Sequence, residues 1–201
     1  VETVLRRTAG TACDPQKLRG DSVAESAGEK AGIIRPGAVV VTRPQQPQAN
    51  DVIGNTILEM GARAVNAVPY VPPVSPASAQ YLAAGSEKNP VSRYPLQVMG
   101  EQILVETPLI VRHQLRNVAL AIAAAEELGR QGFGVTAASI ERGIRETHWP
   151  GRFQVMPAGR GAPGCVFDVA HNPARAAAPG PTLSAGHPAR PLPSHFWASR
   201  G

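Results

Sequence analysis

Apolar residues recur every three or four positions in several stretches of the chain, which is the spacing of an amphipathic helix. The predicted helices cover about residues 22–31, 47–60 and 114–129, and a further helix follows a capping residue, Thr136. Within the third helix, Val118 and Ile122 would face inward. Glu126 and Glu127 lie outside this apolar set, and we expect them to be exposed.

Short runs of β-branched residues predict strands between these helices. The expected strands are residues 38–42, residues 64–68, two strands of a hairpin within 97–110, and the pair 153–156 and 165–167. The strand–helix–strand order over residues 38–68 indicates a parallel sheet in an α/β fold. Residues 1–20 show little pattern and are predicted to be a loop. Residues 69–95 show no period and are predicted to be an irregular loop region with room for one short strand. The Pro-rich and Ala-rich tail after Ala174 is expected to be disordered.

The 201 residues, of which 43% are hydrophobic, predict one domain or one domain plus part of a second. The net charge is +5, and Arg supplies nearly all of the positive charge. This surplus indicates either a generally basic surface or attraction of an anionic small molecule such as a nucleotide. Basic residues do not cluster with interleaved aromatic residues, so we expect no nucleic-acid partner.

Cysteine usage and hydropathy indicate the compartment. Cys13 and Cys165 are isolated, which predicts neither a disulfide framework nor a metal site and favours a reducing environment. The sequence shows no signal peptide and no apolar run of about 18 residues. We therefore expect a cytoplasmic protein with no membrane partner.

Two motifs on the predicted helices carry candidate chemistry. The run EKAGIIRPG, residues 29–37, ends the first helix and places Lys30 near the negative end of its dipole. The run HQLRN, residues 113–117, begins the long helix, where free N–H groups and polar side chains suit an anion or a nucleotide. Ordinary helix capping and termination are the alternatives for both motifs.

Two turns beside the last predicted strands form a third candidate. The run WPGR, residues 149–152, precedes one strand, and DVAHNP, residues 168–173, follows the next. Arg152 would offer a guanidinium fork to phosphate oxygens, and Asp168 and His171 suit phosphate or metal-bound water. The alternative is a turn in which an Asp or Asn side chain satisfies backbone donors.

Taken in order, these motifs resemble the folylpolyglutamate synthase/dihydrofolate synthase family of the Mur ligase superfamily, over roughly residues 14–175. The resemblance implies an α/β fold with a partial Mur-ligase central domain, in which helices cover a parallel sheet, followed by the start of a Rossmann-like C-terminal domain. Residues 1–148 would be the partial central ATPase domain and 149–175 the start of the C-terminal domain. Residues 176–201 would be a disordered or frameshifted tail.

The resemblance implies an ATP-dependent ligase that adds L-glutamate to a folate or dihydropteroate carboxylate through an acyl phosphate, acting as a monomer. Mg²⁺ would neutralise the phosphates. Lys30 would be a carbamylated catalytic lysine that helps to hold the metal, with Glu2 as a second metal ligand. The residues that would bind the nucleotide are His113, Gln114, Asn117, Arg152, Asp168 and His171.

The sequence also departs from the family pattern. It contains no GxxGKS-type phosphate loop, Pro15 stands where the family has a metal-binding His, and Val111 and Val169 stand where Gly is usual. We therefore expect a chain truncated at both ends and inactive in isolation. The alternatives are a non-catalytic nucleotide-binding remnant, a Mur-type ligase for another carboxylate, and a basic interaction protein.

Overall fold

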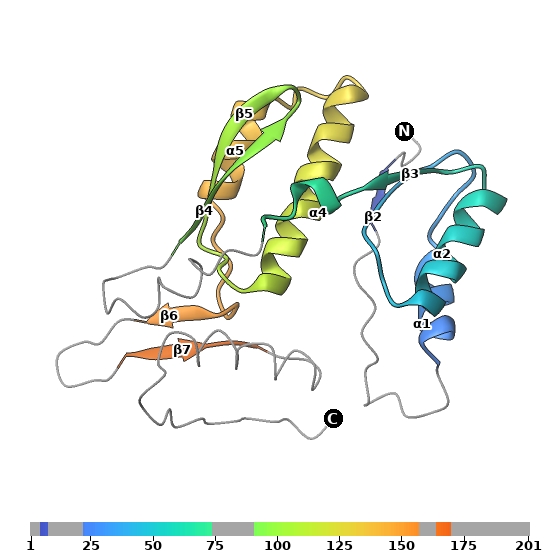
Figure 1. Cartoon of the computed structure of the whole chain (residues 1–201), viewed down its shortest axis with the longest axis horizontal. Coiled ribbons are helices and arrows are strands. Elements are labelled where there is room, and N and C mark those ends of the chain that lie inside the picture. The colour runs from blue at the N-terminus through green and yellow to red at the C-terminus, as the bar shows by residue number, and fades with distance from the viewer. Residues whose placement is uncertain (1–4, 8–21, 74–90, 157–163, 170–201) are drawn as a thin grey trace.

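The computed structural model describes residues 5–7, 22–73, 91–156 and 164–169 of the chain (Figure 1). Its elements follow in the order β1 (Leu5–Arg7), α1 (Val23–Ala31), β2 (Val39–Thr42), α2 (Pro47–Glu59), β3 (Arg63–Asn66), the 3₁₀ turn η2 (Val68–Tyr70), β4 (Ser92–Val98), β5 (Glu101–Thr107), α4 (Arg112–Arg130), α5 (Ala137–Arg145), β6 (Gln154–Met156) and β7 (Cys165–Phe167). The mixed α/β fold predicted from the sequence is confirmed.

A three-stranded parallel sheet forms one part of the molecule, in the order β1-β2-β3. In its centre, Val40 of β2 is in register with Arg6 on one side and with Ala64 on the other. The predicted strand–helix–strand unit is confirmed, because α2 connects the two parallel strands β2 and β3. The prediction of a loop over residues 1–20 was wrong at β1, since a three-residue strand is too short to show a period of two.

The apolar residues of β2 serve two separate cores. Val40 packs with the α1–α2 side of the sheet, in a cluster with Ala31, Ile34, Ile53 and Ile57. Val41 packs on the opposite side, in a cluster with Ala67, Leu120 and Ala123. Alternate residues of a strand point to opposite faces, and both faces are covered here. This double burial explains why β2 reads as a continuous β-branched run.

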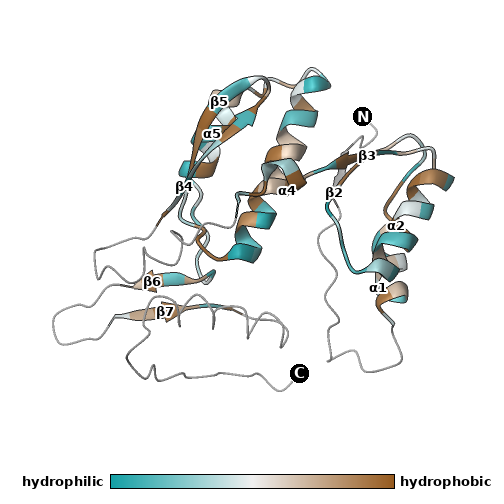
Figure 2. Ribbon diagram, in the orientation of Figure 1, coloured by the Kyte–Doolittle hydropathy of each residue, from teal (hydrophilic) through white to brown (hydrophobic). Residues whose placement is uncertain are grey.

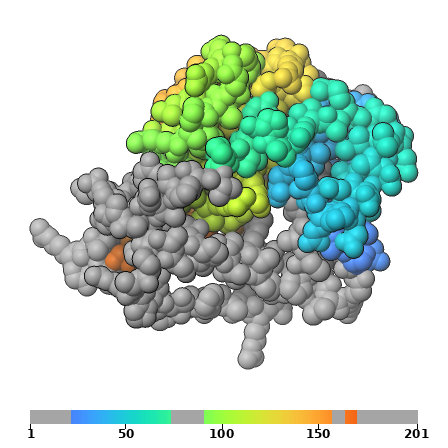
Figure 3. All heavy atoms as spheres, in the orientation of Figure 1, coloured from blue at the N-terminus to red at the C-terminus, as the bar shows by residue number. Residues whose placement is uncertain are grey.

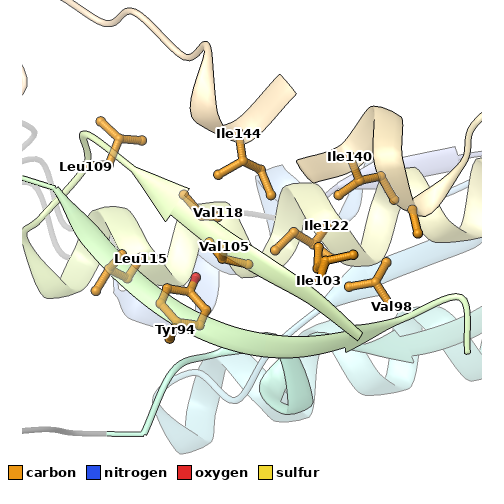
Figure 4. Packing of buried hydrophobic residues seen from close by; sticks show 11 residues of the cluster. Tyr94, Val98, Ile103, Val105, Leu109, Leu115, Val118, Ile122, Ile140 and Ile144 are labelled. Carbon is orange, nitrogen blue, oxygen red and sulfur yellow. The ribbon is translucent and has the colours of Figure 1, made fainter. Parts of the chain in front are cut away.

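Helix α4 lies between the sheet and the β4–β5 hairpin and is apolar on both sides. Leu120 and Ala123 face the sheet, whereas Val118 and Ile122 pack with the hairpin and with α5 (Figure 4). The hairpin and α5 contribute the other residues of this larger core, among them Tyr94, Val98, Ile103, Val105, Ile140 and Ile144. The long helix therefore joins the two halves of the described structure.

The hairpin starts earlier than the sequence pattern predicts. β4 begins at Ser92 and includes Pro95, although residues up to 95 were predicted to be irregular. Proline is tolerated because a two-stranded sheet consists only of edge strands. The two-residue turn is Met99–Gly100, with φ values of +53° and +82°, which is the positive-φ geometry that matches the strand twist.

The expectation that Glu126 and Glu127 are exposed was wrong, since their exposed fractions are 6% and 1%. The Arg63 Nη2 atom lies 2.8 Å from Glu127 Oε1, and the Tyr70 hydroxyl donates to Glu126 Oε2 at 2.7 Å. Arg130 pairs with both carboxylates. Partners from β3 and η2 thus replace the water that these side chains lose, because buried charges must be paired.

The last two strands form an antiparallel hairpin, in which Val155 is in register with Val166. Both strands were predicted from their apolar runs. In the view of Figure 1 this hairpin lies on the side of the molecule at which α4 begins. Among the residues that the structure describes, no helix has the length and hydropathy that crossing a membrane requires.

Candidate functional site

The first candidate site is the start of α4. Val111 occupies the N-cap position and makes no side-chain bond to the helix. By contrast, Ser22 caps α1 and Thr136 caps α5. In each case the side chain of the capping residue accepts from the N–H of the third helical residue, whose side chain accepts from the N–H of the capping residue. Ordinary capping therefore does not explain the polar residues that begin α4. Figure 2 shows the hydrophilic colouring at this end of the helix.

Three predicted nucleotide-binding residues gather within this first stretch of α4. Gln114 is buried, and its Oε1 atom accepts a hydrogen bond from Asn117 Nδ2 at 3.5 Å. His113 and Asn117 are half-buried, so both still reach solvent. The buried glutamine holds the amide of Asn117 from one side. This arrangement leaves a polar, partly accessible surface at the positive end of a 19-residue helix.

The second candidate site is the turn that joins WPGR to Asp168. The Phe153 N–H donates to Asp168 Oδ2 at 2.7 Å, and the Val169 N–H donates to the Gly151 carbonyl at 2.8 Å. Arg152 Nη1 donates to the Val169 carbonyl at 2.9 Å. The Arg152 guanidinium also lies over the Trp149 ring, 5.8 Å from its centroid. Two motifs that are distant in sequence therefore form one hydrogen-bonded unit.

Backbone geometry explains two residues of this unit. Gly151 has a φ of +70°, and a Cβ atom there would lie 2.9 Å from Val169 Cγ2. Phe153 also has a positive φ, +51°, and the bond from its N–H to Asp168 holds it there. Asp168 thus satisfies a backbone donor, which is the structural alternative considered for this motif. Its proposed contact with a nucleotide stays a prediction.

Lys30 lies apart from both sites. It is exposed in the last turn of α1, and its Nζ atom lies 3.5 Å from Ser26 Oγ. Helices α1 and α4 pack against opposite faces of β2, so the structure does not bring Lys30 together with the residues that begin α4. The predicted residues Glu2 and His171, like Pro15, lie outside the described residues.

A metal site is not formed by the residues that the structure describes. Within these ranges, no three or more His, Cys, Asp or Glu side chains come together as ligands. An unmodified lysine such as Lys30 is a cation and a hydrogen-bond donor, and donates here toward Ser26. The role of Lys30 as a carbamylated metal ligand and the role of Glu2 therefore stay predictions.

Arg43, which directly follows β2, is a further candidate site residue that was not predicted from the sequence. Its Nε atom is buried and has no hydrogen-bond partner, while its Nη1 donates to the Pro44 carbonyl at 3.2 Å. Burial, together with the charge of nearby Arg116, lowers the pKa of Arg43. The position after a buried strand was the available signal, since ligands of α/β sheets gather at the carboxyl ends of the strands.

No protein-family model matches the chain. Curated relatives do: it is 30% identical over 177 residues to the dihydrofolate synthase/folylpolyglutamate synthase of Bacillus subtilis, covering 86% of this chain and 38% of the relative. It is also 30% identical over 164 residues to the folylpolyglutamate synthase of Lacticaseibacillus casei, covering 81% of this chain and 36% of the relative. The chain therefore spans less than two fifths of the length of either relative.

Solved structures give the same result. The apo form of L. casei FPGS matches with a TM-score of 0.71 at 26% identity, over 90% of this chain and 42% of that one. The chain is folylpolyglutamate synthase-like. An FPGS–AMPPCP–folate complex matches with a TM-score of 0.72 at 26% identity over the same shares of the two chains. Mycobacterium tuberculosis folylpolyglutamate synthase complexed with ADP matches with a TM-score of 0.61 at 25% identity, over 90% of this chain and 38% of that one.

These comparisons confirm the family resemblance and the Mur-ligase fold that the four motifs predicted. The comparisons do not assign single residues of this chain to a ligand.

Proposed function

We propose that this chain carries nucleotide-binding elements of an ATP-dependent ligase that adds glutamate to a folate or dihydropteroate carboxylate. The observation that carries the proposal is the polar start of α4, where Gln114 and Asn117 are held together without acting as a helix cap. Support comes from similar solved structures that are complexes with AMPPCP and folate or with ADP.

The second half of the proposal concerns Arg152 and Asp168. Arg152 Nη1 donates to the Val169 carbonyl, and the stacking of the Arg152 guanidinium on Trp149 limits the movement of this group. Asp168 accepts a hydrogen bond from the Phe153 N–H with one of its two carboxylate oxygens, Oδ2. A guanidinium held in this way is preorganised for phosphate oxygens, and a carboxylate oxygen beside it can accept from a ribose hydroxyl.

Mg²⁺ would neutralise nucleotide phosphates during such a reaction. The described residues provide no cluster of metal ligands, so no step is assigned to a metal on this part of the chain. What these residues can do is bind and orient the nucleotide. Positioning is a substantial part of catalysis in phosphoryl transfer.

Isothermal titration calorimetry of the full chain with AMPPCP tests the nucleotide part of this proposal. We expect saturable binding, and we expect Asn117→Ala to weaken it about tenfold, because it removes a hydrogen-bonding amide. The matched control is Asn55→Ala, which removes an exposed amide from α2. Absence of binding to the wild-type chain, or equal losses in both variants, would contradict the proposal.

The catalytic part needs a separate assay. The assay is incubation with ATP, Mg²⁺, L-glutamate and either dihydropteroate or a folate, in which ligase turnover would release phosphate in proportion to the amide formed. The sequence contains no GxxGKS-type phosphate loop, so we expect no turnover by this chain alone. Binding of AMPPCP without turnover would support the alternative of a non-catalytic nucleotide-binding module. Turnover with another carboxylate substrate, but with neither pterin, would instead favour a different Mur-type ligase.

A further inference from the structure

Arg43 directly follows β2 and Arg116 lies near the start of α4; they are here called the arginine pair. Val41 of β2 and Leu120 of α4 are fully buried in one cluster. Residues two apart share a strand face, and residues four apart share a helix face. Arg43 is two positions beyond Val41, and Arg116 is four positions before Leu120. Arg43 lies one residue past the end of β2. This spacing, together with the effect of the Arg116 charge on Arg43, places both arginines toward the start of α4.

The arginine pair carries two like positive charges. No ion pair within the described ranges includes either residue. The buried Nε–H of Arg43 lacks a hydrogen-bond partner, which is costly for a charged donor. Burial and the repulsion from Arg116 lower the pKa of Arg43. Two like charges held together this way are unfavourable unless an anion joins them.

The start of α4 adds a third positive element. Backbone N–H groups at a helix N-terminus carry a partial positive charge, and no side chain caps this end. Both arginines are half-buried, so each remains within reach of solvent. In Figure 3 the yellow-green surface that begins α4 lies next to the light-blue surface of the β2–α2 region.

We propose that Arg43 and Arg116 form a binding site for a phosphate group beside the start of α4. Guanidinium N–H groups from both arginines can donate to the oxygens of one phosphate group. A dianion matches two guanidinium charges better than a single carboxylate does. This site goes beyond the proposed ligase function, because it requires neither the WPGR turn nor recognition of a nucleoside.

Thermal melting of the full chain in chloride and in inorganic phosphate, at constant ionic strength, tests the site. We expect saturating phosphate to raise the Tm of the wild-type chain by about 5 °C. In Arg43→Met and Arg116→Met, which keep the apolar stem, this rise should disappear. In chloride, these variants should melt at the wild-type Tm or above it, because the repulsion is gone.

The matched control is Arg142→Met, which removes an exposed charge from α5 and should keep the full rise with phosphate. A wild-type Tm that phosphate does not raise would overturn the proposal, as would an equal rise in both arginine-pair variants. Should either variant fail to melt cooperatively, Arg43→Lys provides the second test. It retains the charge but not the fork, and should weaken phosphate binding about tenfold.

The phosphate group could be free phosphate or part of a nucleotide, and competition separates these sources. If the site holds a phosphoryl group of a nucleotide, saturating phosphate should weaken AMPPCP binding in calorimetry. If it holds free phosphate, AMPPCP affinity should be unchanged while the arginine-pair variants still lose the phosphate-dependent rise. A chain that shows this rise but binds no AMPPCP would contradict the proposed ligase function and leave the phosphate site supported.

Discussion

At the residue scale, the structure gives a clear physical reason for one residue of the WPGR motif, Gly151. The glycine of this motif has a positive φ and lies against Val169, so its identity follows from backbone geometry and close packing. A sequence shows that Gly151 is present but not which atom approaches it. The motif could therefore be recognised from sequence, whereas the contact with Val169 could not.

Gly151→Ala should destabilise the β6–β7 hairpin by about 2 kcal/mol, because an L-residue at φ +70° is strained and the added Cβ meets Val169. Faster hydrogen exchange of the Phe153 and Val169 amides measures this. Gly134→Ala, where the added Cβ meets nothing within 4 Å, is the matched control. The double variant with Val169→Gly should recover only the steric part, and full recovery would show that φ strain plays no role.

Replacement of Tyr94 or Tyr70 by Phe should have different effects on the stability of the protein. The Tyr94 hydroxyl is buried without a partner and burial raises its pKa to about 12, whereas the Tyr70 hydroxyl donates to buried Glu126. Tyr94→Phe should be neutral or stabilising, since it removes an unsatisfied group. Tyr70→Phe should cost about 1.5 kcal/mol in urea unfolding. The reverse order of the two stabilities would contradict the assigned hydrogen bonds.

At the element scale, helices and strands followed their apolar periods closely, and the errors arose from contacts between elements. α5 begins after Thr136 as predicted, because capping is local. Glu126 and Glu127 were misjudged because their partners Arg63 and Tyr70 are more than 50 residues away in sequence. A helix that packs on two sides buries positions that a single apolar stripe leaves exposed.

The Glu127 carboxylate predicts a pH dependence of stability. Arg63, through its hydrogen bond and charge, lowers the pKa of Glu127 below its usual 4.5. A lowered carboxyl pKa stabilises the fold above the unfolded value, and this stability is lost as pH falls through the folded value. The Tm should therefore drop as the pH decreases below about 4.5.

Glu127→Gln tests this assignment by melting across pH. It should cost about 2 kcal/mol at pH 7, since hydrogen bonds to a charged group are lost or weakened. Its Tm should fall less steeply than that of the wild type in the acidic range. Glu29→Gln, which changes an exposed carboxylate on α1, is the control and should keep the wild-type profile. A wild-type profile in Glu127→Gln would contradict the role of this ion pair.

At the scale of the whole molecule, the order of four short motifs indicated the family before any geometry was known, and the comparisons agree with it. The parallel sheet was also predictable, because buried strands alternate with helices. The relation between sites was not predictable: the sequence did not show that Lys30 and the start of α4 lie on opposite sides of β2.

The central claim is that this folylpolyglutamate synthase-like chain binds a nucleotide at the start of α4 and at the WPGR turn. Backbone amide NMR during titration with AMPPCP tests it most directly, because the chemical shifts of amides throughout the chain are followed in one experiment. The predicted result is saturable shifts concentrated at residues 112–117, 151–153 and 168–169, with α1 and α2 little changed. Shifts confined to α1 and α2, or no saturable shifts at all, would contradict the claim.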